Sequence, residues 1–431
     1  MKKIAFYTLG CKVNQYETNG MIQKFIENGY KIVEFHQKAD IYVVNTCTVT
    51  NISDRKSRQI LRRAKEINPE AMVVAVGCYV QIAKEQIEKM PEIDLCLGTN
   101  EKKEIVKYVE KYLQNGDTNE IDDVFQNKEY GDFGNVTYTE KARAVIKVQD
   151  GCDRFCSYCL IPYARGRVRS RNPESVLSEI RKIAENGIKE VVVTGIHVAS
   201  YGKDFQENYQ LIDLLEEINQ IDGIERIRLG SIEPLLIDSE FLERLQKLHK
   251  ICHHFHLSLQ SGCDETLKRM NRRYTIEQFT EIVKNLRNTY EDVILTTDII
   301  VGFPGETEEE FENTYHFLKK IKFYKMHVFK YSARSGTKAT RMENQVANSV
   351  KEERSKKLIA LSEENQKFYH EQYVGKKVEI LLEEKDGEIW KGHTANYLLV
   401  KAKSELDLIN NIVKAEVKDF TGNELLADNV T

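Results

Sequence analysis

Three cysteines in one short run constrain this chain more than any other feature of its sequence. Cys152, Cys156 and Cys159 are spaced C-x3-C-x2-C and directly follow a short apolar segment, residues 144–148. A loop this short can wrap three thiolates around one metal centre but has no fourth ligand to offer. Structural zinc sites and ferredoxin-type clusters take four protein ligands, whereas three cysteines on a [4Fe-4S] cluster leave one iron open. The spacing favours that open cluster over a zinc site completed by a distant histidine or three unrelated core thiols.

The composition is that of a soluble globular protein with several domains. At 431 residues, with 41% hydrophobic and 30% charged residues, the chain predicts two to four domains. No run of about 18 apolar residues is present, and the N-terminus reads as a strand, not a signal peptide. Nine cysteines, an odd number, indicate reduced intracellular thiols and metal sites. The net charge of −4 excludes a globally basic nucleic-acid binder but permits a local basic patch. We expect a cytoplasmic protein without a membrane segment.

Residues 1–114 alternate apolar runs with amphipathic helical patterns. Strands are expected over residues 3–9, 41–44, 72–76 and 93–97, and helices over 16–28, 55–67, 83–89 and 102–113. This alternation predicts a doubly wound, parallel α/β domain. The polar and acidic residues 115–137 that follow read as a linker.

Residues 138–370 repeat the alternation on a larger scale. Strands are expected over residues 144–148, 190–194, 226–229, 254–259, 293–300 and 326–331, with helices over 173–186, 211–221, 238–248, 276–290 and 308–321. Six strands joined by helical crossovers predict an open (β/α)6 barrel, two units short of the closed eightfold form. A charged helix then leads to residues 371–431, where period-two runs separated by glycine and asparagine predict a small all-β barrel.

A second set of cysteines stands at equivalent places in the first domain. Cys11, Cys47 and Cys78 each follow an expected strand. Because loops at the carboxyl ends of parallel strands converge on one site, these three thiols are predicted to hold a second cluster with an open iron. The alternative is that they are buried small hydrophobes, which is the interpretation that we give to Cys96, within its strand. Cys252 and Cys263 have no partner at ligand spacing, so the same reading applies to them.

With both triplets in place, the chain resembles the radical S-adenosylmethionine (SAM) methylthiotransferases along nearly its whole length. The matching stretches are LGCKVNQYET (9–18), NTC (45–47), GC (77–78), GCDRFCSYC (151–159), PYARGR (162–167), LSLQSG (257–262) and DIIVGFPGET (298–307). The resemblance implies an N-terminal domain with an auxiliary [4Fe-4S] cluster, a radical-SAM core and a C-terminal TRAM domain that binds RNA. Two features depart from the family pattern. Cys263 stands where serine is expected, and the tail contains more Asp and Glu than Lys.

Two stretches, KVNQYET (12–18) and GIHVASYG (195–202), are most similar to the branch that methylthiolates threonylcarbamoyladenosine 37 in tRNA. The resemblance implies that SAM is cleaved at the Cys152 cluster to a deoxyadenosyl radical, which takes hydrogen from carbon 2 of the adenine. A sulfur carried by the Cys11 cluster, methylated by a second SAM, is then delivered there. An unactivated C–H bond cannot be opened by acid–base groups, so cofactors do this step and the protein positions them. The implied partners are the tRNA anticodon loop and an external reductant such as flavodoxin or ferredoxin.

The candidate SAM contacts lie at strand ends of the expected barrel, where such folds place their sites. They are Tyr158, Thr194, Gly195, Ser231, Glu233, Gln260, Asp298 and Gly302. Structural roles are equally open for Ser231, Glu233 and Asp298. Gly302 could also belong to a plain turn before a helix with a capping box.

Alternating arginines beside the cysteine loop are the candidate RNA contacts. Arg165, Arg167, Arg169 and Arg171 can present one charged edge to phosphates. The alternative is a solvated loop, or ion pairs that stabilise the fold.

Other functions fit parts of the same pattern. The substrate could instead be isopentenyladenosine in tRNA or an aspartate of a ribosomal protein. A different class would be a non-catalytic iron–sulfur electron carrier or an RNA-binding protein. Two three-cysteine sites argue against a carrier, because an open iron serves substrate binding.

Overall fold

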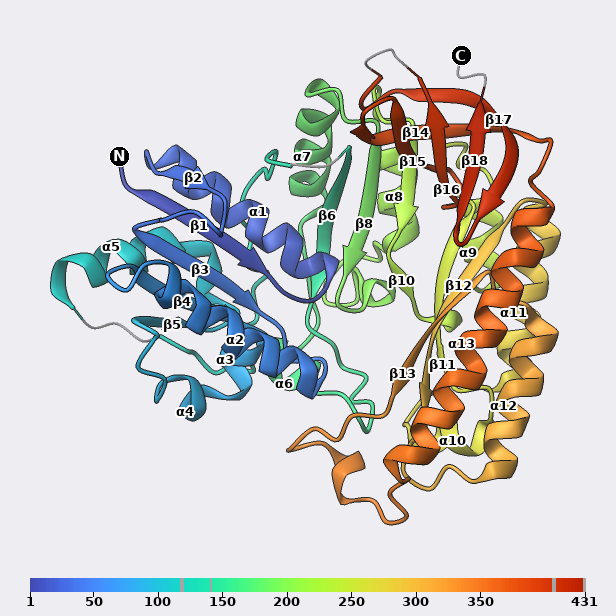
Figure 1. Ribbon diagram of the computed structural model, residues 1–431, viewed down its shortest axis with the longest axis horizontal. Helices are drawn as coiled ribbons and strands as arrows, with labels where there is room; N and C mark the ends of the chain where they lie inside the picture. Colours follow the sequence, from blue (N-terminus) through green and yellow to red (C-terminus); the bar gives the residue numbers. More distant parts are fainter. Residues whose placement is uncertain (117–119, 140–141, 405–407, 429–431) are drawn as a thin grey trace.

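The computed structural model describes residues 1–116, 120–139, 142–404 and 408–428, which form three units in chain order (Figure 1). Residues 117–119 of the expected linker lie outside the described residues, as do 405–407 and 429–431 of the expected C-terminal barrel. In the described part of the chain, no helix has the length and apolar composition needed to cross a membrane.

The N-terminal unit is a parallel sheet with the strand order β2-β1-β3-β4-β5. Its strands are β1 (Lys3–Thr8), β2 (Lys31–Val33), β3 (Ile41–Thr46), β4 (Met72–Gly77) and β5 (Leu95–Leu97). One face packs against α1 (Lys12–Glu27) and α5 (Ile105–Asn115). The other packs against α2 (Asn51–Ile67), α3 (Cys78–Ile82) and α4 (Lys84–Ile87). Because the central strands are buried on both sides, they read as continuous apolar runs, and the doubly wound prediction is confirmed.

Three details of this unit differ from the sequence expectation. The helix expected over residues 83–89 is the shorter α4, and a helix that was not expected, α3, precedes it and begins at Cys78 itself. The helix expected from residue 102 begins as a 3₁₀ turn, η1 (Glu101–Glu104), before α5. The edge strand β2 was not expected, since three residues are too short for a periodic pattern.

The central unit is the expected open barrel of six parallel strands. They are β6 (Arg143–Asp150), β8 (Glu190–Gly195), β9 (Arg226–Leu229), β11 (His254–Gln260), β12 (Ile294–Val301) and β13 (Lys325–Lys330). A single parallel bridge, Ile227 to Ile251, joins the β6-β8-β9 half to the β11-β12-β13 half. The short strand β7 (Arg169–Ser170) pairs antiparallel with β6, and β10 (Ser231–Ile232) pairs with β11.

Amphipathic helices follow the barrel strands and bury their apolar faces against them. They are α7 (Pro173–Glu185), α8 (Leu211–Asn219), α9 (Ser239–Leu245), α11 (Ile276–Thr289) and α12 (Glu308–Ile321). The long helix α13 (Asn348–Glu371) packs along β13 and connects to the last unit (Figure 1).

The C-terminal unit is a closed barrel with the strand order β14-β15-β16-β18-β17. Its strands are β14 (Lys377–Asp386), β15 (Ile389–Thr394), β16 (Leu399–Lys403), β17 (Ile412–Thr421) and β18 (Glu424–Asp428). It covers the end of the central barrel where the strands begin. There the ring of Tyr397 stacks on His254 at 4.7 Å, and Arg228 donates to the carbonyls of Thr394 and Ala395. The opposite end of the barrel is therefore the one left for chemistry.

Residues 120–139 run between the first two units and carry no helix or regular strand. They are nevertheless packed: Val124, Phe133 and Val136 are buried, and the Tyr130 hydroxyl donates to the Lys147 carbonyl at 2.8 Å. The polar composition of this segment hid the few apolar residues that anchor it.

Candidate two-cluster active site

The first cysteine triplet lies on the loop after β6, at the carboxyl end of the barrel. Each of the three sulfurs accepts one N–H group. The backbone N–H of Arg154 points at Cys152 Sγ (3.5 Å), that of Ile161 at Cys159 Sγ (3.4 Å), and the Arg272 guanidinium at Cys156 Sγ (3.5 Å). Donors aimed at sulfur stabilise thiolate ligands and tune a bound cluster.

The thiols of this loop bind a metal only by losing their protons. Burial raises the pKa of Cys152 to about 11 and that of Cys159 to about 12. Such thiols keep their protons until a metal displaces them, and the thiolate is the form that ligates. The three cysteines on one loop, each with an N–H donor at its sulfur, fit a cluster held by three thiolates.

The three cysteines of the second triplet lie at the ends of three adjacent strands. Cys11 is the N-cap of α1 after β1, Cys47 follows β3, and Cys78 opens α3 after β4. A Cβ atom on Gly10 would lie 2.8 Å from Cys47 Sγ, so the Cys11 and Cys47 loops are in direct contact. Cys11 is exposed, whereas Cys47 and Cys78 are buried. This gives a three-thiol site with one side open.

The other cysteines have the core positions that we expected. Cys96 lies inside β5 and is buried, and Cys252 and Cys263 are also buried.

The central barrel supplies contacts to the second triplet. Arg165, on α6 (Ile161–Arg165) just after the first triplet, donates its Nε–H to Cys78 Sγ at 3.3 Å. Arg334, after β13, donates to Thr48 Oγ1 (2.6 Å) and pairs with Asp54 (2.7 Å), next to Cys47. The auxiliary site is thus completed by residues from a different unit.

A buried charge cluster fixes the two units together around Arg165. Its acidic members are Glu17 on α1 and Asp150 at the end of β6, and Lys102 and Lys147 lie within 2.6–2.7 Å of these carboxylates. Arg165 contacts both carboxylates and Asn14 Oδ1. Burial alone would raise the pKa of Glu17, but Arg165, Lys102 and Lys147 hold it well below its usual range. The carboxylates therefore stay ionised and hold the two cysteine sites in a fixed relation.

The predicted RNA contacts in the arginine run require a correction. Arg165 and Arg171 are fully buried and Arg169 is 2% exposed, so these three side chains cannot reach phosphates. Arg171 pairs with Glu179 and Asp132, and Arg169 donates to the Arg165 carbonyl. The physical reason is that this segment packs between two units whose facing surfaces carry acidic side chains.

Arg167 differs from its three neighbours. Its side chain is 60% exposed, and its ion pair among the described residues is with the exposed Asp153 at 3.2 Å. It remains a candidate RNA contact.

Among the candidate SAM contacts outside the cysteine loop, Glu233 shares a partner, Arg272, with the first triplet. Arg272, which reaches Cys156 Sγ, also donates to Glu233 at 3.0 Å, and His197 Nε2 lies 3.5 Å from the same carboxylate. Arg154 is 3.7 Å away. Burial opposes it, but the hydrogen bond from His197 and the charges of Arg272 and Arg154 lower the pKa of Glu233 below its usual value. Arg272, which is not at a strand end, and His197, which lies two residues after β8 in the stretch 195–202, were not selected from the sequence.

The remaining candidates fall into different surroundings. Tyr158 packs its ring against Phe303, and Thr194 is buried at the end of β8. A Cβ atom on Gly195 would lie 2.8 Å from Gln149 Oε1. Gln260 ends β11 with a positive φ of 71°, and Ser231 is exposed.

Gly302 has a structural role in the fold. Its N–H donates to Glu306 Oε1 at 2.9 Å, and a Cβ atom there would lie 2.3 Å from Lys351 Cγ on α13. These contacts support the interpretation that Gly302 belongs to a turn.

Asp298 lies deeper, on the inner face of the barrel. Its carboxylate is 3.2 Å from His256 Nε2, and ligand atoms of His256, Asp298 and His327 lie within 4.8 Å of one another. The hydroxyl of Thr296 lies 3.0 Å from both His256 Nδ1 and His254 Nε2. Strands β11, β12 and β13, which carry these side chains, therefore give the barrel a polar interior below the cluster loop.

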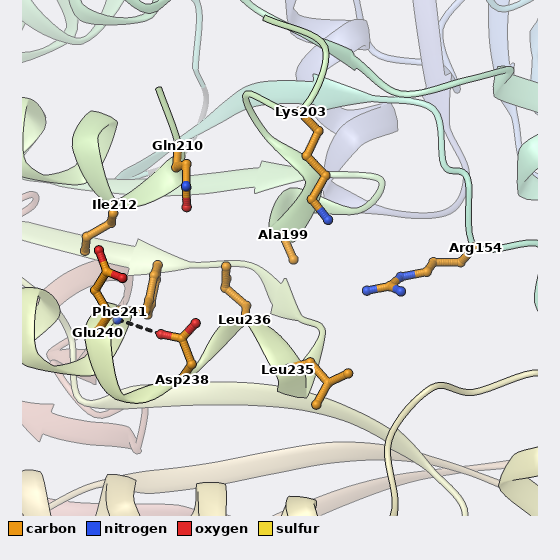
Figure 2. Close-up of a pocket in the computed structure, with 10 residues that line it drawn as sticks. All are labelled: Arg154, Ala199, Lys203, Gln210, Ile212, Leu235, Leu236, Asp238, Glu240 and Phe241. Atoms are coloured by element: carbon orange, nitrogen blue, oxygen red, sulfur yellow. Dashed lines mark hydrogen bonds between the residues drawn. The ribbon is translucent and has the colours of Figure 1, made fainter. Parts of the chain in front are cut away.

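A pocket opens beside the cluster loop, between the segment after β8 and the segment after β10 (Figure 2). Arg154 from the cluster loop and Lys203 face it on one side, and Leu235, Leu236 and Phe241 line the other. None of the six cluster cysteines is among its lining residues. The pocket is therefore next to the chemistry and not at its centre.

Comparison with known proteins decides the family. The Radical SAM superfamily model matches residues 146–318, and the Uncharacterized protein family UPF0004 model matches residues 3–98. The threonylcarbamoyladenosine tRNA methylthiotransferase MtaB of Bacillus subtilis is 42% identical over 97% of this chain and 94% of its own length. The chain belongs to the radical-SAM methylthiotransferase family.

Other relatives and structures extend this finding. The MtaB protein of Aquifex aeolicus is also 42% identical, over 93% of this chain and 96% of its own length. The tRNA-2-methylthio-N(6)-dimethylallyladenosine synthase of Caldicellulosiruptor saccharolyticus is 35% identical over 98% and 91%. The solved structure of the radical S-adenosylmethionine methyltransferase TsrM from Kitasatospora setae aligns with a TM-score of 0.58 at 16% identity, over 76% of this chain and 73% of that chain. At that identity the likeness concerns the fold.

Family membership confirms the cofactor prediction of two [4Fe-4S] clusters and SAM. It also agrees with the geometry, since each triplet leaves one ligand position open.

Proposed function

We propose that this methylthiotransferase converts threonylcarbamoyladenosine at position 37 of tRNA to its 2-methylthio derivative. The observation that carries the proposal is the pair of three-cysteine sites held together by the buried cluster around Arg165 and Glu17. The names of the MtaB relatives at 42% identity support the substrate. When bound, the two clusters supply reductive cleavage of SAM and a carrier for the transferred sulfur.

The residues of this chain bind and orient the reactants. We propose that Glu233 accepts a hydrogen bond from the SAM amino group and that Arg272 and Arg154, which both pair with Glu233, hold the SAM carboxylate. Tyr158, Thr194, Gly195 and Gln260 are the further contacts that we propose for SAM around the barrel mouth. We also keep two further residues among the proposed SAM contacts: Ser231, which is exposed at the barrel mouth, and Asp298, on the inner face of the barrel.

The division of labour follows the three units. We propose residues 1–114 as the auxiliary-cluster domain, 115–137 as the connecting segment, 138–370 as the radical-SAM core and 371–431 as a TRAM domain that contacts tRNA. The closed barrel of the last unit supports this assignment. The proposed partners are the tRNA anticodon loop and a reductant such as flavodoxin or ferredoxin, in the cytoplasm.

Isopentenyladenosine in tRNA is the second candidate substrate, because a relative of that specificity is 35% identical over nearly the whole chain. Nucleoside mass spectrometry of tRNA from a strain lacking the protein separates the two. We expect 2-methylthio-threonylcarbamoyladenosine to disappear, its unmethylthiolated precursor to accumulate, and the isopentenyl derivative to be unchanged. Loss of the isopentenyl methylthio nucleoside alone would overturn the proposed substrate.

A further inference from the structure

An exposed group of aromatic rings and one arginine lies on the outside of the cluster loop. Phe155 and Tyr163 have ring centroids 5.8 Å apart, and Phe125 lies 6.3 Å from Tyr163. The Arg167 guanidinium covers Phe155 at 5.1 Å and Phe125 at 6.0 Å. We call these four residues the aromatic platform.

The platform is turned toward solvent. Tyr163 is 45% exposed and Phe125 is 40% exposed, and the Arg167 side chain is 60% exposed. Adjacent large rings that remain exposed on a folded protein mark an interaction site more often than isolated apolar residues do. The rings meet edge to face and Arg167 covers one side of Phe155 and Phe125, so the exposed surface on which a further ring can stack belongs to Phe125 and Tyr163.

Three separate segments are locked together to build it. Gly151 has φ +72°, and a Cβ atom there would lie 1.8 Å from the Arg167 carbonyl oxygen. Gly166 also has φ +72°, and its Cβ atom would lie 2.3 Å from the Val124 carbonyl oxygen. The backbone N–H of Cys152 donates to the Gly166 carbonyl at 3.1 Å. These close contacts, possible only for glycine, hold the platform in a fixed place.

That place is beside both cysteine sites. Phe155 directly precedes Cys156 in the first triplet. Arg167 is two residues from Arg165, which donates to Cys78 of the second triplet. A partner bound on the platform is therefore next to the chemistry of both.

We propose that the aromatic platform binds unstacked nucleobases of an RNA loop, namely those that flank the target nucleotide. This rests on the proposed function and extends it to a specific surface. Proteins read single-stranded RNA loops by stacking splayed bases on aromatic rings and on arginine planes. A base-binding surface needs exposed rings with few competing charges, and the platform offers three rings with the single pair Arg167–Asp153.

The test measures the binding of an anticodon stem-loop to the reconstituted full chain at two salt concentrations. Replacing Phe125 and Tyr163 together by alanine should weaken binding roughly 5- to 150-fold for each stacked base lost. The salt dependence should stay as in the wild type, because no phosphate contact is removed. Arg167→Gln should weaken binding and also flatten the log–log salt slope by about 0.7 if its charge lies near a phosphate.

Phe368→Ala is the matched control. Its ring is likewise 40% exposed and covered by a cation, Lys322, at 3.8 Å, but it lies on α13. This variant should bind the stem-loop like the wild type. Iron content and melting temperature show whether each variant has folded. If the double variant loses iron, Tyr163→Leu replaces it, because leucine keeps much of the side-chain volume but has no aromatic ring.

A second readout follows the bases directly. With 2-aminopurine next to the target nucleotide, binding to the wild type should change its fluorescence, and Tyr163→Leu should lose that change. Wild-type affinity in the double variant, or a loss equal to that of Phe368→Ala, would overturn the platform while leaving the proposed function intact. A weakened affinity with a flattened salt slope in the double variant would also overturn it. Failure of the wild type to modify tRNA would instead count against the proposed function.

Discussion

The two cysteine sites of this protein use the same number of ligands but are assembled in different ways. Cys152, Cys156 and Cys159 lie on one loop, and two of the three receive backbone N–H donors from that same loop. Cys11, Cys47 and Cys78 come from three strand ends, and the Arg165 donor to Cys78 comes from another unit. The first site is therefore encoded locally, whereas the second depends on how the first two units dock.

The largest effect should come from the local site. Replacing Cys152, Cys156 and Cys159 together by alanine should lower the content from about eight irons per chain to about four, since each [4Fe-4S] cluster depends on its cysteines. SAM cleavage should be abolished. Iron analysis after anaerobic reconstitution checks this, and full iron content in the variant would show that the loop holds no cluster.

The second-largest effect should come from changing Arg165, which joins the N-terminal and central units. Arg165→Met leaves Glu17 and Asp150 buried with fewer cations, and breaking a buried charge cluster in this way typically costs ~3–5 kcal/mol of folding free energy. Iron should be lost selectively from the auxiliary site, while the loop cluster is kept. Denaturant unfolding and iron analysis measure both effects.

Arg167→Gln provides the matched control for that variant. Arg167 stands two residues away with an exposed ion pair, so its removal should change folding free energy by no more than about 0.5 kcal/mol. Equal losses in the two variants would mean that the buried cluster does not hold the units together.

A smaller effect is expected at Arg272, which donates to Cys156. Arg272→Met should keep the loop cluster, because Cys152 and Cys159 retain their backbone donors. It should nevertheless raise KM for SAM by roughly 10–100-fold, the range seen when supporting partners of metal sites are removed, because Glu233 loses Arg272 and keeps His197 and Arg154. The KM for SAM and the iron content are measured together, and loss of iron without a change in KM would assign Arg272 to the cluster alone.

The sequence predicted the sites in proportion to how local they are. Spacing alone identified the loop triplet, and strand-helix alternation with cysteines at strand ends identified the second. The fold class followed from the same periodicity. The short strands β2, β7, β10 and β18 were not predicted, because segments of two to five residues show no clear period. Pairing with neighbouring strands determines their conformation.

The arginine run shows where sequence reasoning stops. Alternation could not distinguish a row of phosphate contacts from a row of buried ion pairs, because the deciding partners lie on other elements: Glu17 on α1, Asp150 on β6 and Glu179 on α7. The same holds for Arg272 and His197 at Glu233. Long-range charge pairing is a property of the packed units and leaves no local pattern.

The most direct test of the account is product analysis with the Cys11, Cys47 and Cys78 triple alanine variant. We predict that this variant, reduced with dithionite, still cleaves SAM to 5′-deoxyadenosine, because the loop cluster is self-contained. No 2-methylthio nucleoside should appear in the tRNA, because the site that carries the sulfur is gone. Normal yield of the methylthio nucleoside from this variant would contradict the central claim that two separate cluster sites share the reaction.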